Sequence, residues 1–132
     1  MTTTHELTKN QSLVLNALTR ADGPLSAYTI LDQLRPEGFR APLQVYRALD
    51  KLLDYGMVHR LESINAFVAC SHAHGHSHGM TAFAICENCG QVTEFSDDEI
   101  TARVREWTRA SGFKPSKTTI EIRGTCANCA AA

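Results

Sequence analysis

Two Cys-x-x-Cys pairs constrain this chain more strongly than any other feature of its sequence. Cys86 and Cys89 form the first pair, and Cys126 and Cys129 form the second, near the end of a chain of 132 residues. Each pair offers two thiolates from one tight turn, so the four together suit a single tetrahedral ion, above all Zn²⁺. Such an ion would close a whole subdomain. A site filled by four protein thiolates is structural rather than catalytic.

Composition limits the classes of protein to consider. The formal net charge is −1 at pH 7 and both halves of the chain are nearly neutral, so bulk charge gives no support for nucleic-acid binding. No apolar run approaches the roughly 20 residues of a membrane-spanning helix, and no basic stretch followed by an apolar core marks an export signal. We therefore expect a cytoplasmic protein, in which paired cysteines hold metal more often than they form disulfides.

The first half of the chain has the pattern of three helices followed by a hairpin. Apolar spacing and stops at Gly and Pro define the helices, with Thr8 and Ser26 as N-caps. This order predicts a winged helix-turn-helix, whose third helix reads DNA and whose hairpin is the wing. The expected helices span residues 8–21, 26–34 and 42–55, and the expected strands span residues 57–62 and 66–70.

The second half predicts a small α+β unit closed by the zinc. A capping box that begins at Ser96 opens a helix, and Gly112 follows its end. The strands have free edges that a partner subunit could cover. The expected strands span residues 80–86, 91–95 and 118–123, around a helix at 96–110. The predicted fold class is α+β, with a winged-helix DNA-binding domain at 1–71, a His-rich hinge loop at 72–79 and a dimerisation and metal-binding domain at 80–132.

A second set of metal-binding residues lies outside the two pairs. Cys70 precedes an alternating histidine run that ends at His78, while His59 and Glu94 lie on strands to either side. Two imidazoles, a thiolate and a carboxylate would suit Zn²⁺, because a thiolate disfavours harder ions. Taken singly, each has a simpler interpretation. His59 would be a surface residue, Cys70 a small buried apolar residue, and the histidine run a loop that binds metal weakly. Taken together, these residues favour a second metal site.

The start of the third helix supplies candidate DNA contacts. Gln44, Tyr46 and Arg47 lie in its N-terminal turns, which in a recognition helix meet base edges. Arg47 could pair with guanine, and Tyr46 with a thymine methyl or a phosphate. Residues that could hold phosphates are Arg40 before the helix, Lys51 within it and Arg60 in the wing. A solvated helix face with ordinary charges would show the same residues, so the pattern alone leaves both interpretations open.

Five parts of the sequence form a recognisable combination: Ser26–Leu31, Val45–Leu53, Gly56–His59, Cys86–Gly90 and the closing pair Cys126 and Cys129. Together they resemble the ferric uptake regulator family, and their combination is closest to its zinc uptake regulator branch. The resemblance covers nearly the whole chain. It implies a dimeric repressor with an N-terminal winged helix, a hinge and a C-terminal α+β dimerisation domain. In the zinc branch, such a repressor binds double-stranded operator DNA when loaded with Zn²⁺ and controls zinc uptake genes.

The resemblance also implies roles for individual residues. It implies two zinc ions per subunit, of which the structural ion is held by the four paired cysteines. Tyr46 and Arg47 match the family's DNA-reading pair, and Tyr28 matches a tyrosine that contacts the DNA backbone. The regulatory ligands fall on His59, Cys70, His78 and Glu94. Because the histidines alternate, His76 is a reserve for the third ligand.

The chain departs from the family pattern at positions that bear on DNA contact. Leu43 and Gln44 stand where the family commonly has Pro-Thr, which indicates an altered base preference. The Thr-Pro-Gln-Arg segment of the family's first helix is reduced to Thr8–Gln11, which puts the family's contacts from that region in doubt.

Other functions remain open from the residues. A zinc hydrolase needs an open coordination position and a general base. The second site would be filled by protein, so we expect no enzyme and no small-molecule substrate besides the metal ion. A peroxide sensor is the stronger alternative, because a thiolate near metal can oxidise. Cys70 argues against a related-branch sensor of iron, manganese or nickel. A zinc-stabilised interaction module would bind no DNA.

Overall fold

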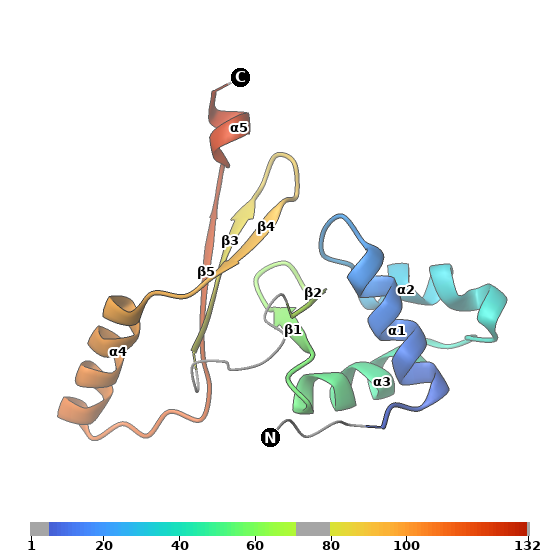
Figure 1. The fold of residues 1–132 in the computed structure, drawn as a ribbon, viewed down its shortest axis with the longest axis horizontal. Helices are drawn as coiled ribbons and strands as arrows, with labels where there is room; N and C mark the ends of the chain where they lie inside the picture. Colours follow the sequence, from blue (N-terminus) through green and yellow to red (C-terminus); the bar gives the residue numbers. More distant parts are fainter. Residues whose placement is uncertain (1–5, 71–79, 132) are drawn as a thin grey trace. The chain divides into compact units, whose positions relative to one another are not determined.

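The computed structural model describes residues 6–70 and 80–131 (Figure 1). These two ranges belong to two separate compact units. Within the described residues, the first unit contains three α-helices, a short 3₁₀ helix and a two-stranded hairpin. The second contains a three-stranded sheet and two helices. These elements confirm the predicted fold class, a winged helix followed by an α+β unit. The predicted hinge loop, residues 72–79, lies outside the described residues.

The elements follow one another in the predicted order. The first unit is built from α1 (Lys9–Arg20), α2 (Ala27–Leu34), the 3₁₀ helix η1 (Arg35–Glu37), α3 (Pro42–Asp54), β1 (Val58–Leu61) and β2 (Ala66–Ala69). The second unit is built from β3 (Met80–Cys86), β4 (Val92–Phe95), α4 (Asp98–Ser111), β5 (Thr118–Gly124) and α5 (Ala127–Ala130). The sequence predicted neither η1 nor α5. Among the helices of the described ranges, none combines the length and apolar character that crossing a membrane requires.

The first two helices begin at the predicted caps. The Thr8 hydroxyl accepts a hydrogen bond from the Gln11 amide at 3.2 Å, and the Gln11 side chain accepts one from the Thr8 amide at 3.1 Å. Before α2, the Ser26 hydroxyl accepts a hydrogen bond from the Thr29 amide at 3.1 Å. A cap of this kind stabilises a helix by about 1 kcal/mol. The polar residue ahead of each apolar stripe therefore fixes where the helix starts.

The third helix begins with a cap that the sequence did not predict. Pro42 occupies its first turn, where the missing amide removes no helical hydrogen bond, and Ala41 has no side chain that can cap. Instead, the Gln44 side-chain oxygen accepts hydrogen bonds from the backbone amides of Arg40 at 2.6 Å and Ala41 at 3.0 Å. The chain leaves α3 through Gly56, whose φ of +74° is a left-handed conformation that glycine adopts readily.

The helices and the wing of the first unit share one apolar core. The two wing strands are antiparallel, and His59 lies opposite Val68. Phe67 on β2 exchanges two backbone hydrogen bonds with Leu25, at 2.8 and 3.0 Å, which hold the wing against the helices. Burying each large apolar side chain stabilises the fold by about 1.5–3 kcal/mol. The buried core residues are Val14, Leu18, Ala27, Ile30, Leu31, Leu34, Phe39, Val45, Ala48, Leu49, Leu52, Val58 and Phe67.

The second unit is a three-stranded sheet in the order β4-β3-β5. The central strand β3 pairs antiparallel with β4, which places Phe83 opposite Glu94. It pairs parallel with β5, which places Cys86 opposite Gly124. Strands β4 and β5 therefore form the edges of this sheet, and the segment that contains α4 carries the chain from one edge to the other.

The fourth helix begins at a different cap from the one predicted. The Asp97 carboxylate accepts hydrogen bonds from the Glu99 amide at 2.9 Å and the Ile100 amide at 3.2 Å, so Asp97 is the N-cap. The prediction of a capping box at Ser96 is therefore wrong. A carboxylate is favoured here because its charge also interacts with the positive end of the helix dipole. Gly112, with φ of +71°, ends the helix as predicted.

The buried residues within the described part of the second unit all come from its central strand. They are Ala82, Phe83, Ile85 and Cys86. The fourth helix has no buried residue, and its Trp107 is 64% exposed. In Figure 1 this helix stands apart from the faces of the sheet. So small a core offsets little of the entropy lost on folding, and small domains of this kind usually depend on a metal or a partner chain.

Candidate metal centre and nucleic-acid interface

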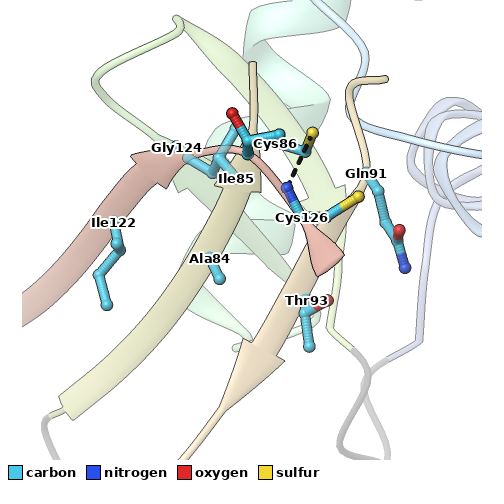
Figure 2. A pocket seen from close by; sticks show the side chains of 9 residues that line it. Ala84, Ile85, Cys86, Gln91, Thr93, Ile122, Gly124 and Cys126 are labelled. Atoms are coloured by element: carbon cyan, nitrogen blue, oxygen red, sulfur yellow. Dashed lines mark hydrogen bonds between the residues drawn. The ribbon is translucent and has the colours of Figure 1, made fainter. Parts of the chain in front are cut away.

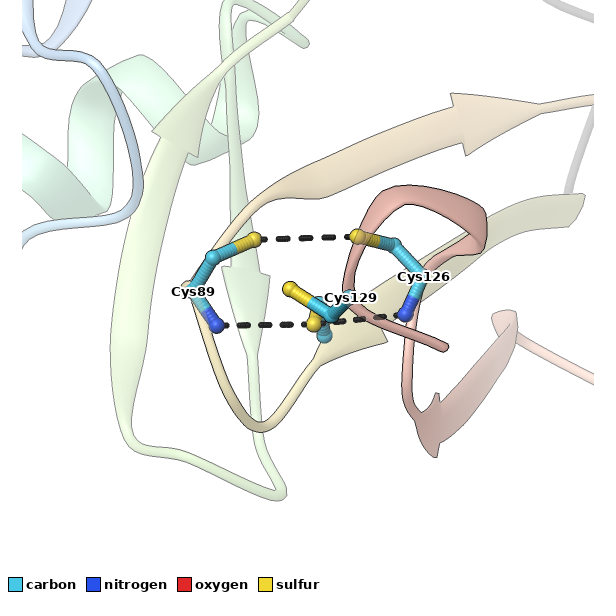
Figure 3. A group of neighbouring side chains, drawn as sticks. Cys89, Cys126 and Cys129 are labelled. Atoms are coloured by element: carbon cyan, nitrogen blue, oxygen red, sulfur yellow. Dashed lines mark hydrogen bonds between the residues drawn. The ribbon is translucent and has the colours of Figure 1, made fainter. Parts of the chain in front are cut away.

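The four paired cysteines gather at one end of the sheet in the second unit (Figure 3). Cys86 ends β3, Cys89 lies in the following turn, Cys126 precedes α5 and Cys129 lies within it. Their sulfur atoms all lie within 4.8 Å of one another, and 3.8 Å separates the sulfurs of Cys89 and Cys126. Four sulfurs about 2.3 Å from a central zinc would lie about 3.8 Å apart, whereas a disulfide requires about 2.05 Å. The cluster therefore fits a tetrahedral zinc ion.

Strand pairing brings the two cysteine turns together. The parallel ladder of β3 and β5 continues to Cys86 opposite Gly124, and the Glu87 amide donates to the Gly124 carbonyl at 2.7 Å. The first cysteine turn closes through a 3.0 Å hydrogen bond from the Gly90 amide to the Cys86 carbonyl. Gly90 has a φ of +78°, which glycine adopts without strain. The register of the sheet thus sets the distance between the pairs.

The four thiols do not ionise alike. The Cys86 sulfur accepts hydrogen bonds from the backbone amides of Cys89 at 3.4 Å and Cys126 at 3.3 Å. These bonds lower the pKa of Cys86 from its ordinary 9.0 to about 6. The Asn88 side chain lowers the pKa of Cys129, but the Cys126 thiol and burial oppose it, and the pKa of Cys129 rises to about 11. These hydrogen bonds favour the thiolate form of Cys86, whereas the neighbouring thiol and burial favour the protonated form of Cys129. A bound zinc ion would require both cysteines as thiolates.

A shallow hollow of about 130 Å³ adjoins the cluster on the sheet (Figure 2). Ala84 on β3, Thr93 on β4 and Ile122 on β5 contribute to its lining, which reaches Cys86 and Cys126. The lining residues include neither a carboxylate nor an imidazole. Apolar, amide and hydroxyl side chains therefore line the hollow beside the two cysteine thiols.

The first unit holds two of the four predicted regulatory ligands. His59 lies on β1 and Cys70 directly follows β2, and both are half-buried. Pairing of the two strands brings these residues together, and their ligand atoms lie within 4.8 Å of each other. Glu94 is half-buried on β4 of the second unit, while His78 and its reserve His76 lie outside the described residues. The complete set of four regulatory ligands stays a prediction.

The N-terminal turns of α3 contain the residues predicted to read DNA. Arg47 is exposed, Tyr46 is half-buried and Leu43 is 56% exposed. Residues separated by three and four positions lie on one face of a helix, so these three side chains share a face. Gln44 was predicted to meet bases, but its side-chain oxygen caps the helix. Contacts of these residues with DNA stay a prediction.

Other predicted DNA contacts differ in how freely their side chains are exposed. Tyr28 on α2 is 63% exposed, and Arg40 ahead of α3 is also exposed. Arg60 in the wing donates a hydrogen bond to the Asn65 side-chain oxygen at 3.1 Å, and its guanidinium lies 5.8 Å from the centre of the Phe67 ring. Such contacts restrict the arginine. Arg60 therefore stabilises the wing itself, a role that the sequence did not predict.

The chain is similar to proteins of known role over nearly its whole length. Residues 3–123 match the model of a family described as the ferric uptake regulator family. The zinc uptake regulation protein of Escherichia coli (strain K12) is 38% identical over 124 residues, which are 93% of this chain and 72% of that protein. The zinc uptake regulation protein of Mycobacterium tuberculosis (strain ATCC 25618 / H37Rv) is 31% identical over 126 residues, which are 92% of each chain.

A solved structure shows the same similarity in three dimensions. A zinc uptake regulator complexed with zinc and DNA superposes with a TM-score of 0.89 at 37% identity. The superposition covers 96% of this chain and 84% of that chain. The similarity thus includes both units of the chain.

Proposed function

Because the chain belongs to the ferric uptake regulator family, we propose that it is a zinc-responsive transcriptional repressor that binds operator DNA as a dimer and controls zinc uptake genes. The observation that carries this proposal is the likeness, over 96% of the chain, to a zinc uptake regulator complexed with zinc and DNA. The winged helix would supply the DNA-binding site, and the four-cysteine cluster would hold the zinc ion that stabilises the second unit. As a DNA-binding repressor, the protein would act in the cytoplasm.

We further propose that each subunit holds two zinc ions. The structural ion would be bound by the four paired cysteines, and the regulatory ion by His59, Cys70, His78 and Glu94. Support comes from the half-buried His59 and Cys70, whose ligand atoms lie within 4.8 Å of each other. A set of two nitrogens, one sulfur and one oxygen suits Zn²⁺, and the thiolate disfavours harder ions.

Ligation by this set would couple the wing to the second unit. His59 and Cys70 belong to the wing, His78 to the predicted hinge loop and Glu94 to strand β4. A two-fold dimer reads two half-sites only when its recognition helices are about 34 Å apart, one turn of DNA. If ligation favours this arrangement, zinc must tighten DNA binding and DNA must tighten zinc binding by the same factor.

The second unit would provide the dimer interface. Trp107 is 64% exposed and Phe113 is 61% exposed, with ring centres 6.3 Å apart, and Ile122 on the edge strand β5 is 53% exposed. Exposed aromatic groups and free strand edges are features that a partner subunit covers. A second copy would therefore complete a core that the single chain leaves small.

A single cysteine variant tests the regulatory site. Duplexes would first be selected from a random DNA pool with the zinc-loaded protein, and binding then measured by gel shift with and without a chelator. We expect Cys70→Ser to remain folded with one zinc ion per subunit but to lose zinc-dependent binding. Zinc-dependent binding by Cys70→Ser would show that the ligand assignment is wrong.

The same assay tests the repressor proposal independently. If the wild-type protein selects no duplex at any zinc concentration, the proposed function is wrong. Selection that requires Fe²⁺, Mn²⁺ or Ni²⁺ instead of Zn²⁺ would favour a related branch. Release of DNA by peroxide but not by a chelator would favour a peroxide sensor.

A further inference from the structure

Leu43 is the second residue of α3 and is 56% exposed. The proposed function places this helix, labelled in Figure 1, in the DNA major groove. Tyr46 and Arg47 follow Leu43 by three and four positions, so the three side chains share one face. The face that would meet base edges therefore begins with an exposed aliphatic side chain.

Hydrogen bonds fix the first turn of α3 and engage the polar residue beside Leu43. The Gln44 side-chain oxygen accepts from the backbone amides of Arg40 at 2.6 Å and Ala41 at 3.0 Å. The ring of Pro42 restricts the backbone of the same turn. The Gln44 oxygen is thus turned back onto the helix start and is engaged there. Leu43 is left as the large exposed side chain of this turn, on a backbone held in one conformation.

The chemistry of the major groove indicates what Leu43 would recognise. Guanine, adenine and cytosine present hydrogen-bonding groups there, whereas thymine also presents its C5-methyl group, which apolar side chains contact. The N-terminal residues of a recognition helix are those that reach base edges. We propose that Leu43 is a specificity-determining residue that selects thymine by contact with this methyl group, beside the base read by Arg47. The inference rests on the proposed function, because it requires α3 to lie in the major groove.

Replacing thymine with deoxyuridine tests this contact, because the change removes only the methyl group. The probe is a zinc-dependent duplex selected from a random pool, with each thymine replaced in turn and symmetrically in both half-sites. Dissociation constants would be measured by fluorescence anisotropy for the zinc-loaded protein and for Leu43→Ala. Losing contact with one methyl group should weaken wild-type binding about fourfold per half-site at one position. Leu43→Ala should bind the thymine and deoxyuridine duplexes equally well at that position.

Two further variants make the assignment specific. Leu43→Met keeps an apolar side chain of similar volume and should restore sensitivity to the methyl group. Tyr46→Ala tests the other side chain on this face that could contact a methyl group. This variant should bind DNA more weakly, because the proposed function places Tyr46 against DNA, but it should keep the difference between thymine and deoxyuridine at the position assigned to Leu43. Circular dichroism would confirm that each variant is folded.

The possible failures can be told apart. If deoxyuridine has no effect on wild-type binding at any position, or weakens wild type and Leu43→Ala equally, the inference is wrong while the repressor proposal stands. Sensitivity that disappears in Tyr46→Ala and persists in Leu43→Ala would assign the contact to Tyr46 and overturn the inference. If the protein selects no duplex at any zinc concentration, the proposed function fails and this inference fails with it.

Discussion

The two units of the chain bury their side chains in very different ways. In the first, each of the three α-helices and both wing strands contribute buried apolar residues. In the second, the buried residues of the described part all belong to β3, and α4 contributes none. The first unit has the interior of an ordinary small domain, whereas the second has one buried strand between two partly exposed edge strands.

This difference shows how two units of similar length can reach stability by different means. The first is held by burial of apolar surface, which acts throughout the unit. The second places four thiol groups at one end of its sheet and leaves Trp107, Phe113 and Ile122 exposed. We therefore expect folding of the second unit to depend on zinc and on a partner subunit.

Removal of zinc should reveal the largest difference in stability between the two units. Chelation, or Cys86→Ser, is expected to unfold the second unit and leave the first folded, because binding of structural zinc contributes directly to folding free energy. Amide signals in a two-dimensional NMR spectrum would report each unit. Signals from residues 80–131 should collapse toward unstructured positions, while those from residues 6–70 stay dispersed. Dispersed signals from both units in the metal-free protein would contradict this dependence.

Truncation of the core should act on the first unit alone. Leu49 on α3 is fully buried, so Leu49→Ala should lower the free energy of unfolding of this unit by about 2–5 kcal/mol. Urea unfolding of the zinc-loaded protein, followed by NMR signals of each unit, measures the loss. Leu43→Ala is the matched control, because the same substitution at an exposed site should change stability by less than about 0.5 kcal/mol. Equal losses at the two positions would contradict the distinction between buried and exposed leucines.

A change to the exposed aromatic pair should act on assembly of the second unit. Trp107→Ala is expected to weaken dimerisation by about 2 kcal/mol, or roughly 30-fold in the dissociation constant, because buried tryptophans dominate interfaces. Sedimentation equilibrium of the zinc-loaded protein would measure the change. Arg109→Ala, at an exposed position two residues along and so on the opposite face of α4, is the control. If the two variants dimerise equally well, the aromatic pair lies outside the interface.

The smallest effect is expected from loss of a helix cap in the first unit. Ser26→Ala removes the acceptor of the Thr29 amide at the start of α2 and should cost about 1 kcal/mol. Asparagine is a comparable N-cap, so Ser26→Asn should recover most of the loss. Urea unfolding measures both variants. If Ser26→Ala unfolds with the same free energy as wild type, the cap contributes nothing to the stability of this unit.

Local signals in the sequence predicted most elements of the fold. Thr8 and Ser26 were identified as caps because capping involves only residues a few positions apart. The cap of α4 was misassigned because Ser96 and Asp97 are adjacent residues that can both cap, and the difference lies in the charge of Asp97. The role of Gln44 was missed because Ala41 lacks the side chain that would complete a capping box.

Longer-range features were predictable only where chemistry links distant residues. The four cysteines could be grouped in advance because zinc accepts four thiolates, and their sulfurs do meet. The strand order and the exposure of α4 depend on packing that no short motif encodes. For the regulatory site, sequence chemistry indicated the kinds of donor, and the structure adds the proximity of His59 to Cys70.

Zinc dependence of DNA binding can be tested most directly by one titration. A selected duplex would be followed by fluorescence anisotropy across a series of buffered free Zn²⁺ concentrations, with the metal content of the protein measured on both sides of the transition. We expect one zinc ion per subunit before the transition and two after it, with DNA binding rising as the second ion binds. DNA binding that stays constant while the second ion binds, or a metal content that never exceeds one per subunit, would contradict a zinc-responsive repressor.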